Sequence, residues 1–138
     1  MPRILVIEDS PVLHRFIEIS LRGKEITVDS AGRGRVGLEA AIEHPPDIIM
    51  LDLGLPDVDG WQVLDELRAN PSTSRVPVLV STGWEGPEIA VRAHSRGAEV
   101  LPKPYAASDL RTAVLAMLGA DGAKELAFRS PSINGSGT

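Results

Sequence analysis

Residues 48–52 read Ile-Ile-Met-Leu-Asp, and this stretch decides the fold class. A strand with one face in water alternates apolar and polar side chains, whereas Ile48-Ile49-Met50-Leu51 is apolar throughout. Such a run is typical of a strand that helices cover on both faces. It ends on Asp52, and an unpaired carboxylate beside an apolar sheet is costly, so Asp52 is hard to explain as a purely structural residue.

Short apolar runs alternate with amphipathic segments along most of the chain. The predicted strands are about 3–8, 25–30, 47–52, 76–81 and 98–101, and the predicted helices lie near 11–22, 34–44, 58–69, 86–96 and 107–118. Gly23, His44-Pro45-Pro46, Asn70-Pro71 and Gly97 mark the ends of the first four helices. Five βα repeats predict an α/β fold with a doubly wound parallel sheet, which binds ligands beyond the carboxyl ends of its strands.

Four of these strands end at residues that could take part in binding or transferring a phosphoryl group: Glu8-Asp9, Asp52, Thr82 and Lys103. Carboxylates gathered at one sheet edge would repel one another by on the order of 4 kcal/mol per close pair at an effective dielectric of about 20. A divalent cation, Mg²⁺, would relieve that repulsion. The ammonium of Lys103 and the hydroxyl of Thr82 would complete a cradle for a phosphoryl group.

Each group also has a plainer interpretation when it is taken alone. Glu8-Asp9 precedes Ser10-Pro11 and could be a turn or a helix cap. Thr82 could fill a sheet position, and Lys103 could be a surface lysine. Because all four occur together at strand ends of one topology, the sequence favours a phosphorylation site.

Composition predicts one small domain. The 138 residues are 43% hydrophobic and 24% charged, enough for one core of ordinary size. The absence of cysteine excludes disulfides and thiolate metal sites, and the net charge of −5 argues against direct binding to nucleic acid. No signal peptide and no run of roughly 20 apolar residues is visible, so we expect a cytoplasmic protein without membrane contact.

Two short motifs suggest other ligands. Residues 32–37, Gly-Arg-Gly-Arg-Val-Gly, match the GxGxxG pattern, but they follow the second strand and not the first. We interpret Gly32 and Gly34 as turn residues and Gly37 as a site of close helix–sheet packing. Residues 57–60, Asp-Val-Asp-Gly, resemble part of a calcium loop, yet Leu55 occupies the first ligand position, so a turn and helix cap is the better interpretation.

Over about residues 1–118 the sequence resembles the receiver domain of two-component response regulators. The matching pieces are ILVIEDS (4–10), IIMLDLGLPDVDGWQVL (48–64), VPVLVSTG (76–83) and RGAEVLPKPY (96–105). The resemblance implies a flavodoxin-like five-stranded parallel sheet in the order 2-1-3-4-5 with five helices. Residues 119–138 are rich in Gly, Ala and Ser and are expected to form a flexible tail or linker, in which residues 123–129 could extend the last helix.

The resemblance also assigns roles to the acidic residues. Asp52 would be the phosphoacceptor that takes a phosphoryl group from a histidine kinase or a histidine phosphotransfer protein. Asp52 and Asp9 would ligate Mg²⁺ or a substituting Mn²⁺, Glu8 would act through a water, and the carbonyl of Gly54 would add a further oxygen. The chain would then be a regulatory domain with intrinsic self-phosphorylation and autodephosphorylation chemistry, and it would signal to an unknown downstream protein by conformational change.

Lys103 and Thr82 would contact the phosphoryl oxygens, and a cis Lys103-Pro104 bond is expected by analogy. One position departs from the family pattern: Val100 replaces the aromatic residue that usually lies three residues before the lysine and reorients on activation. Trp84 lies two residues after Thr82. We hypothesise that Trp84 partly covers the site and substitutes for the missing aromatic switch.

A surface for the phosphoryl donor can also be predicted. The apolar residues of the helix near 11–22 cover an arc of roughly 200°, wider than the roughly 100° stripe that docks on a sheet. Val12 and Ile19 fall on one margin near Asp9, and together with Pro104 and Tyr105 they are candidates for contact with a donor helix. Alternatively, Val12 and Ile19 extend the core under a neighbouring helix.

Two other functions remain as alternatives. A Mg²⁺-dependent aspartyl-phosphate phosphatase would need a further acid or base near the nucleophile, and Gly54 stands where the DxD pattern of such enzymes places its second Asp. A phosphorylation-independent interaction domain should have lost the acids or Lys103, and it has not. The phosphoacceptor is therefore the favoured interpretation.

Overall fold

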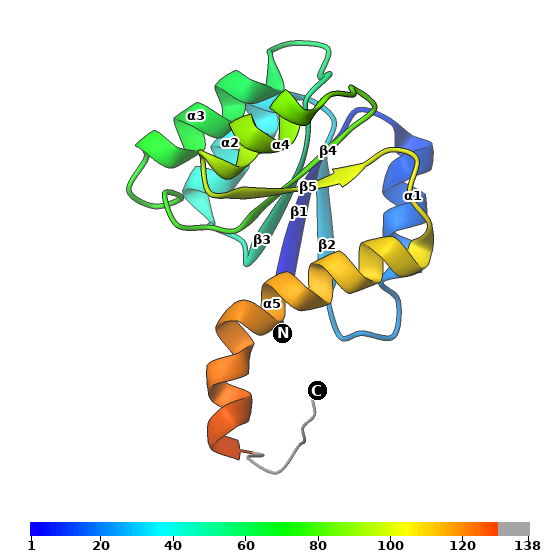
Figure 1. Cartoon of the computed structure of the whole chain (residues 1–138), viewed down its shortest axis with the longest axis vertical. Helices are drawn as coiled ribbons and strands as arrows, with labels where there is room; N and C mark the ends of the chain where they lie inside the picture. The colour runs from blue at the N-terminus through cyan, green and yellow to red at the C-terminus, as the bar shows by residue number, and fades with distance from the viewer. Residues whose placement is uncertain (130–138) are drawn as a thin grey trace.

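The computed structural model describes the backbone of residues 1–129 and the side chains of residues 1–119. Strands and helices alternate along the chain (Figure 1). The strands are β1 (Arg3–Ile7), β2 (Thr27–Ala31), β3 (Ile48–Asp52), β4 (Val78–Thr82) and β5 (Ala98–Pro102). The helices are α1 (Pro11–Ser20), α2 (Gly34–Glu43), α3 (Gly60–Ala69), α4 (Pro87–His94) and α5 (Ala107–Arg129).

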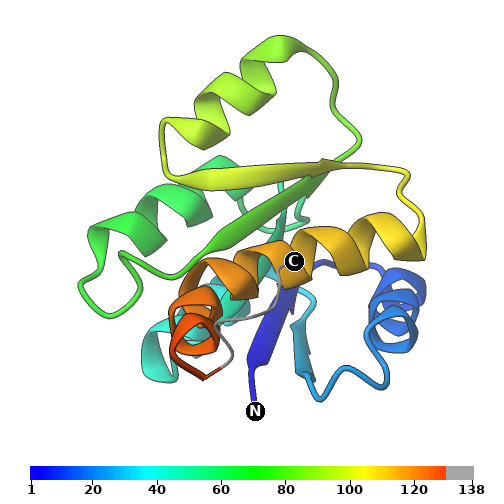
Figure 2. The same ribbon diagram turned by 60° about the horizontal axis from the view of Figure 1, so that its bottom comes forward.

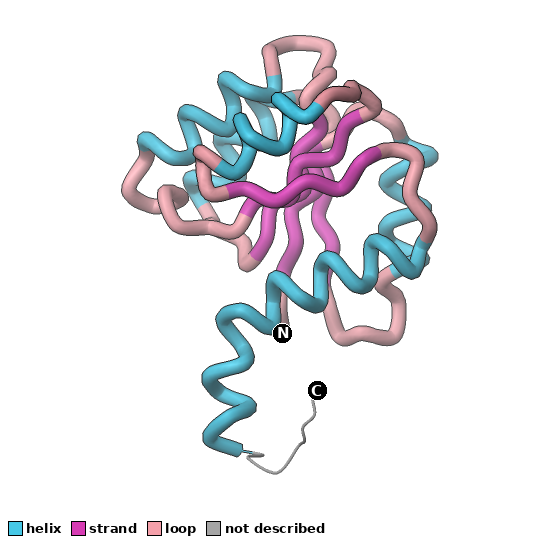
Figure 3. Tube along the Cα trace, in the orientation of Figure 1, coloured by secondary structure: helices cyan, strands magenta, loops and turns pink. Residues whose placement is uncertain are grey.

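The five strands form one parallel sheet in the order β2-β1-β3-β4-β5, which confirms the predicted fold. Figure 3 shows the strands gathered between the helices. Every residue of β3 and β4 is buried, as the unbroken apolar run at 48–51 predicted. The edge strands β2 and β5 carry exposed positions. The winding reverses at β1, because β2 and β3 lie on opposite sides of it.

Helices cover both faces of the sheet (Figure 2). Leu5 and Ile7 of β1 belong to the core beneath α2, α3 and α4, whereas Ile4 and Val6 belong to the core beneath α1 and α5. This alternation along a single strand divides the interior into two apolar clusters, one on each face. The sheet is therefore held rigidly, and the positions of its carboxyl ends are fixed by the packing on both sides.

Local sequence signals set the helix boundaries. Ser10 caps α1, because its Oγ accepts a hydrogen bond from the backbone N–H of Leu13 at 3.2 Å. Asp59 caps α3 in the same way through the N–H of Trp61 at 2.9 Å. Gly23 and Gly97, the predicted helix stops, have φ values of +84° and +69°, which residues other than glycine rarely adopt.

Asp57 has a role that the sequence did not indicate. Its carboxylate accepts hydrogen bonds from the backbone N–H groups of Gly34, at 2.8 Å, and Arg35, at 3.0 Å. The bonds from Arg35 and Gly34 hold the pKa of Asp57 below its usual value. Asp57 thus caps α2 from the loop after β3, which supports a turn-and-cap interpretation of residues 57–60 over a calcium loop.

Gly37 packs closely against the sheet, as predicted for the last glycine of the GxGxxG match. A Cβ at this position would lie 2.6 Å from Cγ1 of Ile7, closer than real contacts allow. Gly60 is equally constrained, because a Cβ there would lie 2.4 Å from Cα of Leu53. These two glycines let α2 and α3 approach the strands that carry the acidic residues.

The last helix is longer than the predicted range 107–118, since α5 continues to Arg129. This agrees with the suggestion that residues 123–129 extend it. The division into a domain over 1–118 and a tail over 119–138 stays a prediction, and residues 130–138 lie outside the described part. Within residues 1–129, the helices are too short or too polar to cross a membrane.

Candidate functional site

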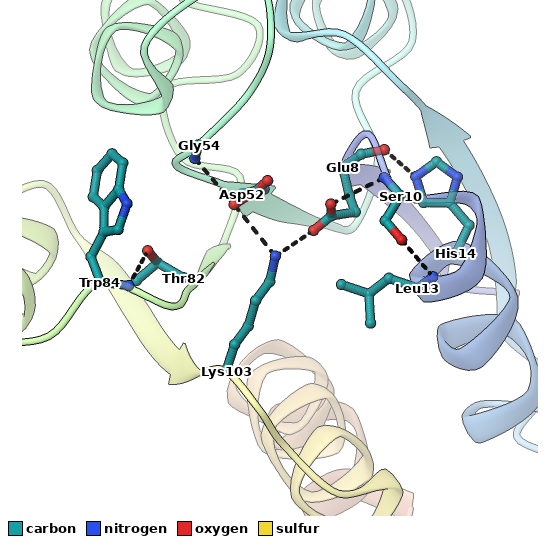
Figure 4. A network of polar contacts seen from close by, with 9 residues as sticks. All are labelled: Glu8, Ser10, Leu13, His14, Asp52, Gly54, Thr82, Trp84 and Lys103. Atoms are coloured by element: carbon teal, nitrogen blue, oxygen red, sulfur yellow. Dashed lines mark hydrogen bonds and ion pairs between the residues drawn. The ribbon is translucent and has the colours of Figure 1, made fainter.

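The carboxyl ends of β1, β3, β4 and β5 bring the predicted polar residues to one edge of the sheet (Figure 4). Glu8 follows β1 directly, Asp52 ends β3, and Thr82 ends β4. Lys103 follows β5 directly. Because the strands are parallel and in register, residues from opposite ends of the chain meet here.

Three acids form the centre of this edge. One carboxylate oxygen each of Glu8, Asp9 and Asp52 lies within 4.8 Å of the others. Glu8 and Asp52 are buried, with 5% and 7% of their surface exposed, whereas Asp9 is open to solvent. This set of hard oxygen donors fits a small divalent cation, with one side left for water.

Lys103 lies between two of the acids, as Figure 4 shows. Its Nζ is 2.8 Å from Oε1 of Glu8 and 3.5 Å from Oδ1 of Asp52. Burial lowers the pKa of Lys103, but the hydrogen bond to Glu8 and the charges of both acids outweigh that effect and leave the pKa above its usual value. The amine is therefore a fixed positive charge beside Asp52.

Glu8 accepts hydrogen bonds on both carboxylate oxygens and on its backbone carbonyl. Oε1 accepts from Lys103, Oε2 accepts from the backbone N–H of Ser10 at 3.2 Å, and the backbone carbonyl accepts from Nε2 of His14. Burial raises the pKa of Glu8, and the hydrogen bond from Lys103 offsets this only in part. No sequence pattern pointed to His14, because a helical histidine six residues from an acid is common and has no fixed meaning.

Asp52 is oriented by its own loop. Its Oδ1 accepts a hydrogen bond from the backbone N–H of Gly54 at 3.1 Å. The indole of Trp84 stands next to this loop: a Cβ built on Gly54 would lie 3.9 Å from Cζ2 of Trp84 and 4.0 Å from Oδ1 of Asp52. Trp84 is 48% exposed, so its ring forms an outer wall of the site.

Thr82 is buried at the end of β4. Its Oγ1 accepts a hydrogen bond from the backbone N–H of Trp84 at 3.0 Å. The hydroxyl proton is not used by that bond, so it remains available to a ligand. The structure thus links the predicted threonine directly to the predicted switch residue.

A groove opens beside the site, between α1 and the loop after β5. It has a volume of about 660 Å³ and is lined by Val12, Leu13, Phe16, Gly83, Pro104 and Tyr105, with Glu8, Ser10 and Lys103 at its polar end. Val12 is 80% exposed, as expected for the margin of α1. Ile19 is also exposed but does not line the groove. The Lys103-Pro104 bond is cis, as expected.

Comparison with known proteins places this arrangement in a family. A sequence model of the response regulator receiver domain matches residues 4–115. The chain belongs to the response regulator receiver family. The receiver domain shares 36% identity over 119 residues with the DNA-binding dual master transcriptional regulator RpaA of Synechocystis, covering 86% of this chain and 49% of RpaA.

Solved receiver domains have the same fold. A signal receiver domain of a Vibrio parahaemolyticus protein described as a Luxo repressor is 29% identical, with a TM-score of 0.83 over 91% of this chain and 95% of that one. The receiver domain of the Pseudomonas aeruginosa sensor histidine kinase PA1611, solved with magnesium coordinated in its active-site cleft, is 28% identical, with a TM-score of 0.76 over 86% and 98%. The chain spans about half the length of the curated regulators that it matches.

The position of Lys103 predicts a pH-dependent stability effect. Lys103→Met leaves the carboxylates of Glu8 and Asp52 without their positively charged partner. In the absence of divalent cations the free energy of unfolding of the variant should therefore fall by about 1–3 kcal/mol at neutral pH. The pKa of Glu8, already raised, rises further without the amine. As the pH falls through that pKa, Glu8 takes up a proton and the deficit should shrink. Urea unfolding in a chelator between about pH 8 and about pH 5 measures it.

Lys24→Met removes an exposed lysine and serves as the control. Magnesium should also reduce the Lys103→Met deficit, because a cation replaces the missing charge. A deficit that changes neither with pH nor with magnesium would show that Lys103 does not balance these acids.

Proposed function

We propose that this receiver domain accepts a phosphoryl group on Asp52 in a Mg²⁺-dependent reaction and signals by a change in conformation. The observation that carries the proposal is the placement of the Lys103 amine within 3.5 Å of the Asp52 carboxylate, at an edge where three acids converge. A nucleophilic carboxylate, a fixed cation and a hard-metal donor set are the three components of phosphoryl transfer to aspartate.

The donor set suits Mg²⁺. Asp9 and Asp52 would ligate it directly, together with the carbonyl of Gly54, and Mn²⁺ would substitute. Glu8 would act through water, because both of its oxygens already accept hydrogen bonds. When bound, the cation would neutralise charge on the phosphoryl oxygens and on the acids. The magnesium reported for the PA1611 receiver domain supports this assignment.

The transfer step uses residues of this chain. A carboxylate oxygen of Asp52 attacks phosphorus in line with the leaving group, and a P–O bond forms while the donor's P–N bond breaks. The electron pair of that bond goes to the imidazole of the donor histidine, which takes up a proton from solvent. Lys103 moves to a phosphoryl oxygen and the Thr82 hydroxyl donates to another. These two groups therefore stabilise the negative charge on the phosphoryl oxygens in the transition state. In the reverse modification a water oxygen attacks phosphorus, the P–O bond to Asp52 breaks, and inorganic phosphate leaves the free carboxylate of Asp52.

The alternatives have less support. A dedicated phosphatase needs an additional acid or base beside Asp52, and Gly54 offers none. A phosphorylation-independent domain has no use for a lysine that bridges two buried acids, which costs desolvation. We therefore propose a regulatory, cytoplasmic phosphoacceptor whose output passes to another protein or to a further domain. The net charge of −5 gives the chain no general attraction to nucleic acid.

Intact-mass measurement tests the phosphoacceptor. Incubation with acetyl phosphate and Mg²⁺ should add one phosphoryl group to the wild type, because acetate is a good leaving group and needs no partner protein. Asp52→Asn should remain unlabelled, since an amide is not a nucleophile of this kind. Labelling of Asp52→Asn to the same extent as the wild type, or labelling without any divalent cation, would overturn the assignment.

We further propose that the groove beside α1 receives a helix of the histidine-containing donor. The groove is continuous with the site, because Lys103 and Glu8 form its polar end. Its walls and Val12 present the apolar surface that a helix needs for docking. Ile19 would extend the contact along the outer side of α1.

Charges introduced on this surface should separate donor binding from chemistry. Val12→Asp with Ile19→Asp should slow phosphoryl transfer from the donor by roughly tenfold or more, since a desolvated carboxylate opposes an apolar contact. Labelling by acetyl phosphate, which needs no docking, should stay at the wild-type rate. Val36→Asp, an exposed residue of α2, is the matched control. Equal loss of both reactions would indicate misfolding and would contradict a docking role.

Trp84 is the proposed reporter of phosphorylation. Position 100 carries valine, so no ring can rotate there, whereas the backbone N–H of Trp84 is bonded to the Thr82 hydroxyl and its ring stands beside Gly54. Movement of Thr82 toward a phosphoryl group would pull on that bond. The ring would then leave its place beside the site.

Tryptophan fluorescence tests this switch. In a Trp61→Phe background only Trp84 emits, and its spectrum should shift when Mg²⁺ and the phosphoryl mimic beryllofluoride are added together. Thr82→Val should abolish most of the shift, because the hydroxyl that couples ring and ligand is gone. An unchanged spectrum in protein that demonstrably binds beryllofluoride would exclude Trp84 as the switch.

A further inference from the structure

Two hydroxyl groups lie buried behind the acidic site without a hydrogen-bond partner. They are Oγ of Ser81 and Oη of Tyr105, which lie close enough to influence each other but make no hydrogen bond of normal geometry within the described part of the chain. Ser81 is only 3% exposed, so solvent does not serve it. A buried hydroxyl that makes no hydrogen bond destabilises the fold, because it has lost its bonds to water and gained nothing.

The two hydroxyls line the same small cavity. Its volume is about 10 Å³, and its polar lining consists of Ser81, Tyr105, Glu8 and Asp52, while apolar side chains of β1, β3 and α1 close the rest. A cavity of about this size is close to the smallest that can hold one water molecule. A buried water typically needs two to four polar partners, and this lining offers four.

The sheet register explains why Ser81 lies beside the acids. Ser81 of β4 is the direct register partner of Asp52 of β3, and Glu8 continues β1 on the other side of β3. Register partners in neighbouring parallel strands point to the same face. The three polar side chains therefore form a row across the sheet on the α1 and α5 face.

Tyr105 closes this row from the loop after β5. Its ring packs against Phe16 of α1, with 6.0 Å between the ring centres. Burial raises the pKa of Tyr105 to about 12; the neighbouring Ser81 hydroxyl lowers it, and the charges of Glu8 and Asp52 raise it further. The hydroxyl is therefore a neutral donor at physiological pH.

We propose that the Ser81 and Tyr105 hydroxyls hold one structural water behind the acidic site, and that this water hydrogen-bonds the carboxylates of Glu8 and Asp52. Both hydroxyls donate to its oxygen, and its two protons point at the two acids. All four groups and the water are then satisfied. Ser81 and Tyr105 become positioning residues, which act on the phosphoacceptor through the water and do not touch the phosphoryl group.

The proposal deepens the phosphoacceptor function and rests on it for its kinetic consequence. A water fixed between two carboxylates reduces their repulsion before a cation arrives, and it limits the rotation of Asp52. Its loss should leave Asp52 less well aimed for in-line attack, because small misplacements slow such reactions.

Removing each hydroxyl tests for the water without any phosphorylation, because the protein should become less stable if a water is bound and more stable if none is. Tyr105→Phe and Ser81→Ala each remove little more than one oxygen. If the hydroxyls serve a water, each variant should unfold at a lower urea concentration than the wild type. If they are truly unpartnered, removal relieves a penalty and the midpoint should rise, which would overturn the proposal.

A double variant tests whether the two hydroxyls share one molecule. Ser81→Ala with Tyr105→Phe should lower the midpoint little more than either single change, because the first already releases the water. Independent contributions would instead add. Full additivity would contradict a shared water even if both single variants were destabilised.

Labelling by acetyl phosphate provides the functional measurement. Each single variant should be labelled roughly threefold to tenfold more slowly, and the double variant no more slowly than the worse single. Thr73→Val is the control, since Thr73 is a fully buried hydroxyl bonded to the carbonyl of Leu67 at 2.7 Å, away from the site. It should lose stability but keep the wild-type rate.

A high-resolution crystal structure separates failure of this proposal from failure of the phosphoacceptor function. Density for one water between Ser81, Tyr105 and the acids is expected in the wild type, and it should disappear in Tyr105→Phe. A direct bond between the two hydroxyls with no water would refute the proposal while leaving phosphorylation of Asp52 intact. Wild-type protein that is never labelled would instead refute the phosphoacceptor function, whatever the density shows.

Discussion

The balance of charge at the carboxyl edge of the sheet is the constraint on which the site depends. Glu8 and Asp52 are buried on neighbouring strands, and Lys103, almost a hundred residues later in sequence, supplies the amine between them. Burial raises the pKa of Glu8, and the hydrogen bond from the Lys103 amine offsets that effect in part. In the proposed function, a divalent cation would take over part of the neutralisation of the acids, and a phosphoryl group would take the place of Glu8 beside Lys103.

The parallel sheet makes this arrangement possible. Parallel strands with helices on both faces end at the same edge, so four short polar segments meet although helices and other strands separate them in sequence. Close packing at Gly37 and Gly60 brings α2 and α3 against the strands and holds that edge in place. The rigid part of the molecule therefore carries the charged groups, while the loops that hold Trp84 and Tyr105 surround them.

Much of the fold could be predicted from sequence. An unbroken apolar run such as 48–51 has few interpretations, and Gly23 and Gly97 mark helix ends because glycine readily adopts the positive φ found there. Contacts between residues that are distant in sequence could not be predicted in this way. The Asp57 cap on α2, the contact of His14 with the Glu8 carbonyl and the row formed by Ser81 depend on register and loop path. A serine in a buried strand or a tyrosine after a proline gives no local sign that the two share a cavity.

A crystal structure with Mg²⁺ and beryllofluoride is the most direct test that strand ends gather acid, amine and hydroxyl around one phosphoryl position. The account predicts the metal on Asp9, Asp52 and the Gly54 carbonyl, and beryllium on a carboxylate oxygen of Asp52. Lys103 should have left Glu8 for one fluorine, with Thr82 donating to another. A structure in which Lys103 still pairs with Glu8, or in which Asp9 does not reach the metal, would contradict it.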